Sequence, residues 1–262
     1  GVSYASYRLV PILRELLRYD PDLIILYTGH NEFLEDRSYG RLKRMPHFLV
    51  RLHRVMLNLR TYALADHWFA QRRNGGDQRT VLPVEVRARL DFQHGLESYH
   101  RDVSRRRGII AHFGHNLETM VRLTREVGVP LILMSPVSNL KNCPPFKSEF
   151  QASLSQEQKR SVTGLLDQAA ALDWDHAYGK IRLLEQAVAI DDRHANLLYR
   201  LGLCYQRLGR FNEAGQWFLR AKEEDICPLR MLEAMHEALG RTACRYRVPI
   251  VDVRALVAER TP

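Results

Sequence analysis

Three segments of the chain share one pattern, an amphipathic helix followed by a short apolar strand. In each, apolar residues recur at helical spacing and a Pro or Gly then separates the helix from an apolar run. The three helix–strand units are 7–28, 116–134 and 231–253. Runs that are apolar at every position are typical of parallel strands buried on both faces. We therefore predict an α/β core with helices on both sides of a parallel sheet, in which 23–28, 130–134 and 249–251 are neighbouring strands.

Two long stretches separate these units and are predicted to be helical insertions. The first, 36–114, is rich in arginine and is interrupted by a Gly-rich loop at 73–77, which predicts two or three helices. The second is 154–227. The α/β core is therefore expected in three parts, at 1–35, 115–153 and 228–262.

The second insertion has the residue spacing of a tetratricopeptide repeat, with a turn at 208–212. This spacing predicts two antiparallel helices over 201–224. The residues expected to face one another are Leu201, Tyr205, Ala214 and Phe218. The repeat one period earlier is degenerate, because Asp167 and Lys180 occupy positions that should be apolar or small. A packed helical hairpin and a groove that binds a protein partner are both compatible with the pattern.

The composition restricts the class of protein. With 45% hydrophobic residues in 262, the chain has enough apolar material for a core, and its longest apolar runs are too short to span a bilayer. Lysine and arginine number 39 against 30 acidic residues, a formal charge of +9, which raises the question of a polyanionic partner. The basic residues of 37–107 alternate with apolar residues at helical spacing, which favours a solvated helical face, so nucleic acid is not expected as a partner.

Cysteines and histidines do not indicate a metal site. The four cysteines lie far apart in the sequence without a C-x-x-C pair. They do not indicate whether the protein works in an oxidising or a reducing compartment. His112 and His115 have no third ligand nearby, so with Asn116 they are interpreted as surface or capping residues that open the helix before the second strand. The chain opens at Gly1 without an initiator Met, so we expect sequence upstream. The compartment stays open, and a missing N-terminal segment could place the protein outside the cytoplasm or anchor it to a membrane.

A polar turn, 28–32, directly follows the first predicted strand. The carboxyl ends of parallel strands are where α/β sheets bind their ligands, so this turn is a candidate site. Asn31 could equally cap a following helix through its side-chain oxygen. The position of the turn alone leaves both interpretations open.

The sequence around the turn resembles the SGNH or GDSL hydrolase family. The resemblance covers a helix opened by residues 4–7 and the segment 21–32. The third sequence block of that family is Gly-x-Asn-Asp after a parallel strand; Gly29 and Asn31 match it, and Glu32 replaces the Asp. The resemblance implies an SGNH-like fold with flavodoxin-like layering and no metal or organic cofactor. It also implies that Asn31, Gly29 and Ser3, the last from a second block within 1–6, belong to an oxyanion hole.

Two blocks of the SGNH pattern are absent from the sequence. There is no Gly-Asp-Ser, and the three Asp-x-x-His strings, at 91–94, 173–176 and 191–194, stand out of family order. We therefore expect the chain to be an internal fragment whose nucleophilic Ser and Asp–His pair lie elsewhere in the parent protein, and the fragment itself to be inactive.

The resemblance implies a serine esterase or acyl hydrolase that acts on a small-molecule or acetylated carbohydrate-like ester. Asn139, in the polar loop after the second strand, and Arg230 are candidate substrate-binding residues. Arg230 has a structural alternative, an ion pair with Glu224 or Asp225. Two other functions stay open: an O-acyltransferase that uses the same acyl-enzyme, and a non-catalytic tetratricopeptide module that binds a protein partner on a relic hydrolase core.

Overall fold

The computed structural model describes residues 4–34 and 95–260. Ser3 and most of the first predicted insertion, 36–94, lie outside the described residues. The α-helices of the described part are α1 (Ser6–Leu16), α4 (Val103–Glu126), α5 (Gln156–Ala171), α6 (Ala177–Ile190), α7 (Ala195–Arg207), α8 (Phe211–Glu223), α9 (Glu233–Tyr246) and α10 (Val253–Ala258). Its strands are β1 (Ile24–Tyr27), β2 (Leu131–Ser135) and β3 (Ile250–Asp252).

The three strands form one parallel sheet in the order β1-β2-β3. Ile24 pairs with Leu131, and Leu133 pairs with Ile250. The predicted parallel arrangement of the three helix–strand units is therefore confirmed. It follows from the helices between the strands, since each α-helical crossover returns the chain to the edge at which the previous strand began.

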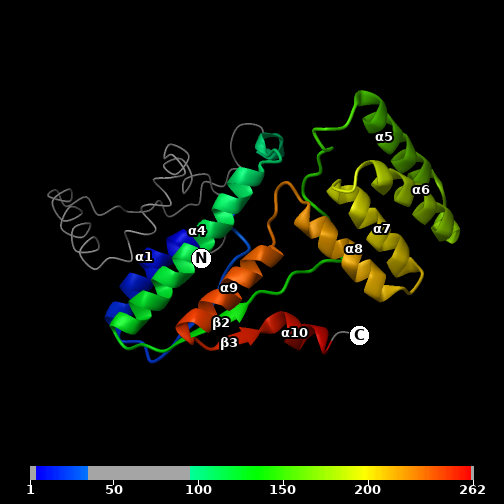
Figure 1. Cartoon of the computed structure of the whole chain (residues 1–262). Helices are drawn as coiled ribbons and strands as arrows, with labels where there is room; N and C mark the ends of the chain where they lie inside the picture. Colours follow the sequence, from blue (N-terminus) through cyan, green and yellow to red (C-terminus); the bar gives the residue numbers. More distant parts are fainter. Residues whose placement is uncertain (1–3, 35–94, 261–262) are drawn as a thin grey trace.

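One face of the sheet carries the core. Helices α1, α4 and α9 lie together on this face (Figure 1), and their apolar side chains close over β1 and β2. Phe113, Leu117 and Leu133 are fully buried there. On the opposite face, Ile25 and Tyr27 are 57% and 47% exposed. The expectation that both faces of the strands are buried therefore does not hold for β1.

Helix α4 corrects the predicted boundary of the first insertion. It begins at Val103, where Asp102 caps it by accepting the Arg105 backbone N–H at 2.8 Å, and not near Asn116. Ile109 and Phe113 are buried in the core, so the end of the Arg-rich stretch belongs to the helix that covers the sheet. His112, His115 and Asn116 consequently lie in the middle of a helix and do not open it.

Helices α5–α8 lie within 154–227 and form a second helical group with its own apolar core (Figure 1). Helices α7 and α8 pair through a three-residue turn at 208–210, in which Gly209 has φ +73°. Leu201, Tyr205, Ala214 and Phe218 are all buried in this core, so the predicted helical hairpin is confirmed. The hairpin packs closely because Gly202 has no side chain where the Phe218 ring lies.

Lys180 is buried although its position in the repeat pattern should be apolar or small. Its Nζ donates to the Ala169 carbonyl at 2.7 Å, in the last turn of α5, and lies 5.0 Å from the centre of the Trp174 ring. A cation at a helix C-terminus satisfies a carbonyl that has no partner within the helix. Lys180, at one of the two degenerate positions of the repeat, therefore stabilises the end of α5. Asp167, at the other, is exposed.

Candidate functional site

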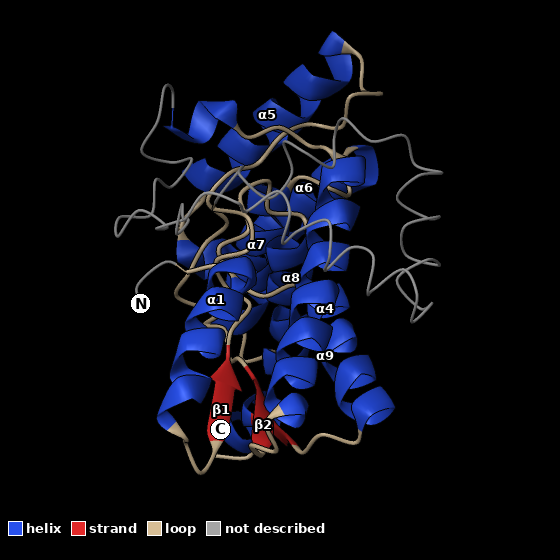
Figure 2. Ribbon diagram, turned by 90° about the vertical axis from the view of Figure 1, so that its left-hand side faces the viewer, coloured by secondary structure: helices blue, strands red, loops and turns tan. Residues whose placement is uncertain are grey.

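The predicted site lies where the carboxyl ends of the strands meet. In Figure 2 the arrows of β1 and β2 point the same way, toward the loops that follow them. These loops are 28–34 after β1 and 136–146 after β2, and Asp252 ends β3. The Ser135 hydroxyl donates to Asp252 at 3.0 Å, so the ends of β2 and β3 are joined by a side-chain hydrogen bond.

Asn31 lies beside the segment that leads into α1, whereas Gly29 lies against Met231. Residues 31–34 form a bend and turn, and the half-buried Asn31 amide nitrogen makes a long hydrogen bond of 3.5 Å to the Tyr4 carbonyl. Gly29 has φ +136°, a conformation that side chains rarely adopt, and it lies against Met231. The structure thus brings Asn31 to Tyr4 and Gly29 to Met231.

Glu32 belongs to a buried polar network that the sequence analysis missed. One of its carboxylate oxygens accepts the Ser6 backbone N–H at 2.7 Å, and the other accepts the Ser6 hydroxyl at 2.8 Å. Asn116 of α4 donates to the same hydroxyl at 2.9 Å. A carboxylate is favourable at a helix N-terminus, where backbone N–H groups lack partners. The network therefore holds the turn that carries Glu32 against α1 and α4. The only sequence signal for it was that Glu32 replaces the Asp of the SGNH pattern.

His30 contacts the segment before α9. Its Nδ1 accepts the Met231 backbone N–H at 3.0 Å. Burial lowers the pKa of His30, a hydrogen bond to the Val137 backbone opposes this shift, and the charges of Lys222 and Arg230 add to it. The ring is therefore neutral near pH 7.

Asn139 and Arg230 both form hydrogen bonds within or to the loop after β2. Asn139 is exposed, and its side-chain oxygen accepts the Asn142 backbone N–H, three residues on, at 2.8 Å. Arg230 is only 6% exposed; it donates to the backbone carbonyls of Asn139 and Cys143 and lies 3.7 Å from the Asp225 carboxylate. This arrangement matches the structural alternative for Arg230, an ion pair that fixes the loop.

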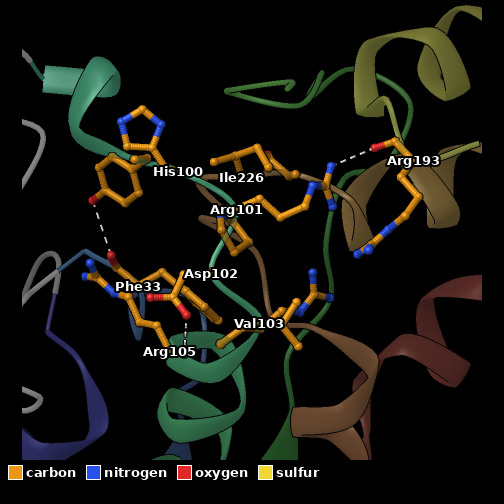
Figure 3. Close-up of a pocket in the computed structure, with 12 residues that line it drawn as sticks. Phe33, His100, Arg101, Asp102, Val103, Arg105, Arg193 and Ile226 are labelled. Carbon is orange, nitrogen blue, oxygen red and sulfur yellow. Dashed lines mark hydrogen bonds between the residues drawn. The ribbon is translucent and has the colours of Figure 1, made fainter. Parts of the chain in front are cut away.

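A small cavity of about 50 Å³ lies beyond this loop, beside the N-terminus of α4 (Figure 3). Three of the four arginines that line it bond to acidic partners: Arg101 and Arg193 both bond to Glu224, and Arg106 bonds to Glu223 at 2.8 Å. The charges on the cavity wall are therefore largely balanced. These ion pairs connect the start of α4 to the end of α8 and join the two helical groups.

His236 on α9 is a buried histidine without a hydrogen bond. It is 9% exposed, and neither ring nitrogen has a hydrogen-bond partner among the described residues. Burial lowers its pKa to about 4, and the charges of Arg254 and Lys222 add to the shift, while Glu233 and Asp252 oppose it. The ring therefore stays neutral in the folded chain at pH values where an unfolded histidine is charged.

We expect this histidine to make stability fall as the pH drops from about 6.5 to 4, because only the unfolded chain takes up the proton in that range. The loss should reach at most about 3 kcal/mol, since one pKa unit corresponds to about 1.4 kcal/mol. Denaturant unfolding across this pH range should show a flatter profile for His236→Leu than for the native chain. The exposed His176→Leu is the matched control, and parallel profiles for the native chain and His236→Leu would refute the assignment.

The described residues contain no group of three or more potential ligands arranged to hold a metal ion. In the same part of the chain, no helix has both the length and the apolar character needed to cross a bilayer. In comparisons with known proteins, no family model, no curated protein and no solved structure matches the chain.

Proposed function

We propose that the chain supplies the oxyanion part of an SGNH-type serine esterase or acyl hydrolase that acts on an ester or acetylated carbohydrate-like substrate. The observation that carries the proposal is the turn at Gly29–Asn31. It follows a parallel strand directly and holds the Asn31 amide beside the Tyr4 backbone. Both the strand-end position and the amide beside the start of α1 agree with the SGNH resemblance.

In this mechanism a Ser hydroxyl from outside the 262 residues attacks the ester carbonyl while a His takes its proton and an Asp orients the His. Negative charge then develops on the carbonyl oxygen. An Asn31 N–H donates to that oxygen, and this is useful because the charge is present mainly in the transition state. The hydrogen bond from the Asn31 amide nitrogen to the Tyr4 carbonyl is long, at 3.5 Å. The amide can therefore still donate a hydrogen bond to the oxyanion.

The acyl-enzyme formed in this way has two fates. Attack by water gives a hydrolase, and attack by a sugar hydroxyl gives an O-acyltransferase. Both reactions use the same oxyanion donor, so the proposal for Asn31 is common to them.

Asn31→Ala should lower kcat by about 10²–10³-fold with little change in KM, because the lost hydrogen bond strengthens mainly in the transition state. The measurement uses the protein extended at both ends, with a short-chain activated ester. Asn31→Asp should be at least as harmful, since its carboxylate would repel the developing oxyanion. The exposed Asn212→Ala is the matched amide control. Near-parental kcat in a folded Asn31 variant would overturn the proposal and favour the non-catalytic interaction module.

A further inference from the structure

The His30 ring joins two segments that are distant in the sequence. It belongs to the turn after β1, and its Nδ1 accepts the backbone N–H of Met231, from the segment before α9, at 3.0 Å. The turn after β1 is therefore tied through one side chain to the backbone that leads into α9.

The bond to Met231 requires a neutral ring. Nδ1 can accept a hydrogen bond only when it carries no proton, so the proton of the neutral ring is on Nε2. The charged groups that face the ring are cationic: Lys222 at the end of α8 and Arg230 before α9. Protonation of Nδ1 would place two N–H groups against each other and break the bond to Met231.

Met231 touches the same turn a second time. A Cβ atom on Gly29 would lie 2.6 Å from the Met231 sulfur, so the backbone and the side chain of Met231 contact two successive residues of the turn. Met231 itself is fully buried in the core of the sheet. The turn is therefore anchored to a rigid part of the molecule.

We propose that His30 is a positioning residue whose neutral ring links the turn after β1 to Met231 and thereby holds Asn31 in the orientation required of the oxyanion donor. The hydrogen-bonded link is a property of this chain alone, whereas its effect on catalysis rests on the proposed function. The role follows from the position of His30 between Gly29 and Asn31, because a displaced ring would displace both neighbours. Neither the link nor its effect needs His30 to touch the substrate.

The link is tested first in the 262-residue chain without any activity measurement. Two-bond ¹⁵N–¹H spectra should show His30 as the Nε2–H tautomer, and hydrogen exchange should show a protected Met231 amide. His30→Leu should raise the exchange rate of that amide about fivefold, the effect of losing one hydrogen bond. In His30→Asn, a side-chain oxygen replaces Nδ1 as acceptor, so protection should persist. The exposed His176→Leu should leave it unchanged. An Nδ1–H tautomer, or equal Met231 exchange in all variants, would overturn the proposal.

The pH profile of the same amide separates this link from general packing. In the native chain, Met231 exchange corrected for its intrinsic pH dependence should accelerate as the pH falls through the lowered pKa of His30. The His30→Asn variant should show no such step, because its acceptor does not titrate. A step that persists in His30→Asn would assign the pH dependence to another group and refute the role of His30.

The catalytic consequence is tested in the extended protein. His30→Leu should lower kcat about tenfold with little change in KM, and His30→Asn should recover most of it. If Asn31→Ala lowers kcat but His30→Leu does not, the positioning role is wrong and the proposed function stands. If neither variant affects kcat while the hydrogen-exchange results hold, the proposed function is wrong and the link is purely structural.

Discussion

Gly29→Ala is expected to lower the free energy of unfolding by about 2–5 kcal/mol. Two costs combine: Gly29 has φ +136°, where an alanine is strained by about 1–3 kcal/mol, and the new Cβ would lie 2.6 Å from the Met231 sulfur. Overpacking of this kind adds about 1–3 kcal/mol, less whatever the flexible Met231 side chain relieves by moving. Chemical denaturation of the purified chain measures the sum.

The control for Gly29→Ala is Gly128→Ala. Gly128 also has a positive φ, +76°, but a Cβ there meets nothing within 4 Å, so only the conformational cost of about 1–2 kcal/mol applies. The packing cost is isolated by combining Gly29→Ala with Met231→Ala, because a smaller side chain at 231 removes the clash. The double variant should therefore be more stable than the sum of the single effects predicts. Equal losses for Gly29→Ala and Gly128→Ala would show that Met231 does not restrict the turn.

Gly202→Ala is expected to destabilise the helical hairpin by about 2–3 kcal/mol, although alanine is the better helix former. A Cβ at Gly202 would lie 2.5 Å from the Phe218 ring, which is buried and rigid, so the α7 and α8 backbones would have to separate. The thermal or denaturant midpoint of the chain measures this loss.

Gly215→Ala is the matched substitution on the partner helix. A Cβ at this position of α8 meets nothing within 4 Å, so only the helix propensity changes, and stability should rise by about 0.5–1 kcal/mol. Opposite signs for the two substitutions are the expected result. A neutral or stabilising effect of Gly202→Ala would show that Gly202 is not needed for the close approach of α7 and α8.

The elements predicted best are those with a strict hydrophobic period. The parallel strands follow from three helix–strand units, and the hairpin follows from positions such as Leu201 and Phe218, whose spacing places them on facing helix surfaces. The start of α4 was missed because arginines between Val103 and Arg107 mask the helical pattern of the buried Ile109 and Phe113. Charge on the solvent side of a helix does not end it, and the Asp102 cap that begins it is a weak local signal.

The place of the turn that carries Gly29 and Asn31 was predicted, but its contacts were not. Gly29 and Asn31 follow β1 as the sequence indicates, since the order of strand and turn along the chain is a local property. The functions of Glu32 and His30 could not be inferred in this way. Glu32 bonds to Ser6, 26 residues before it, and His30 bonds to Met231, 201 residues after it.

The sequence by itself determined the class of fold, the parallel direction of the strands, the helical hairpin and the turn that carries Asn31. Each of these depends on periodicity or on residues adjacent in the chain, which a single sequence displays directly. Only the tertiary structure decided that Arg230 is an ion-pair partner of Asp225, that Lys180 binds the end of α5, and that His30 accepts the backbone N–H of Met231. The reason is physical: a buried polar group takes its role from the partner that satisfies it, and packing selects that partner from any part of the chain.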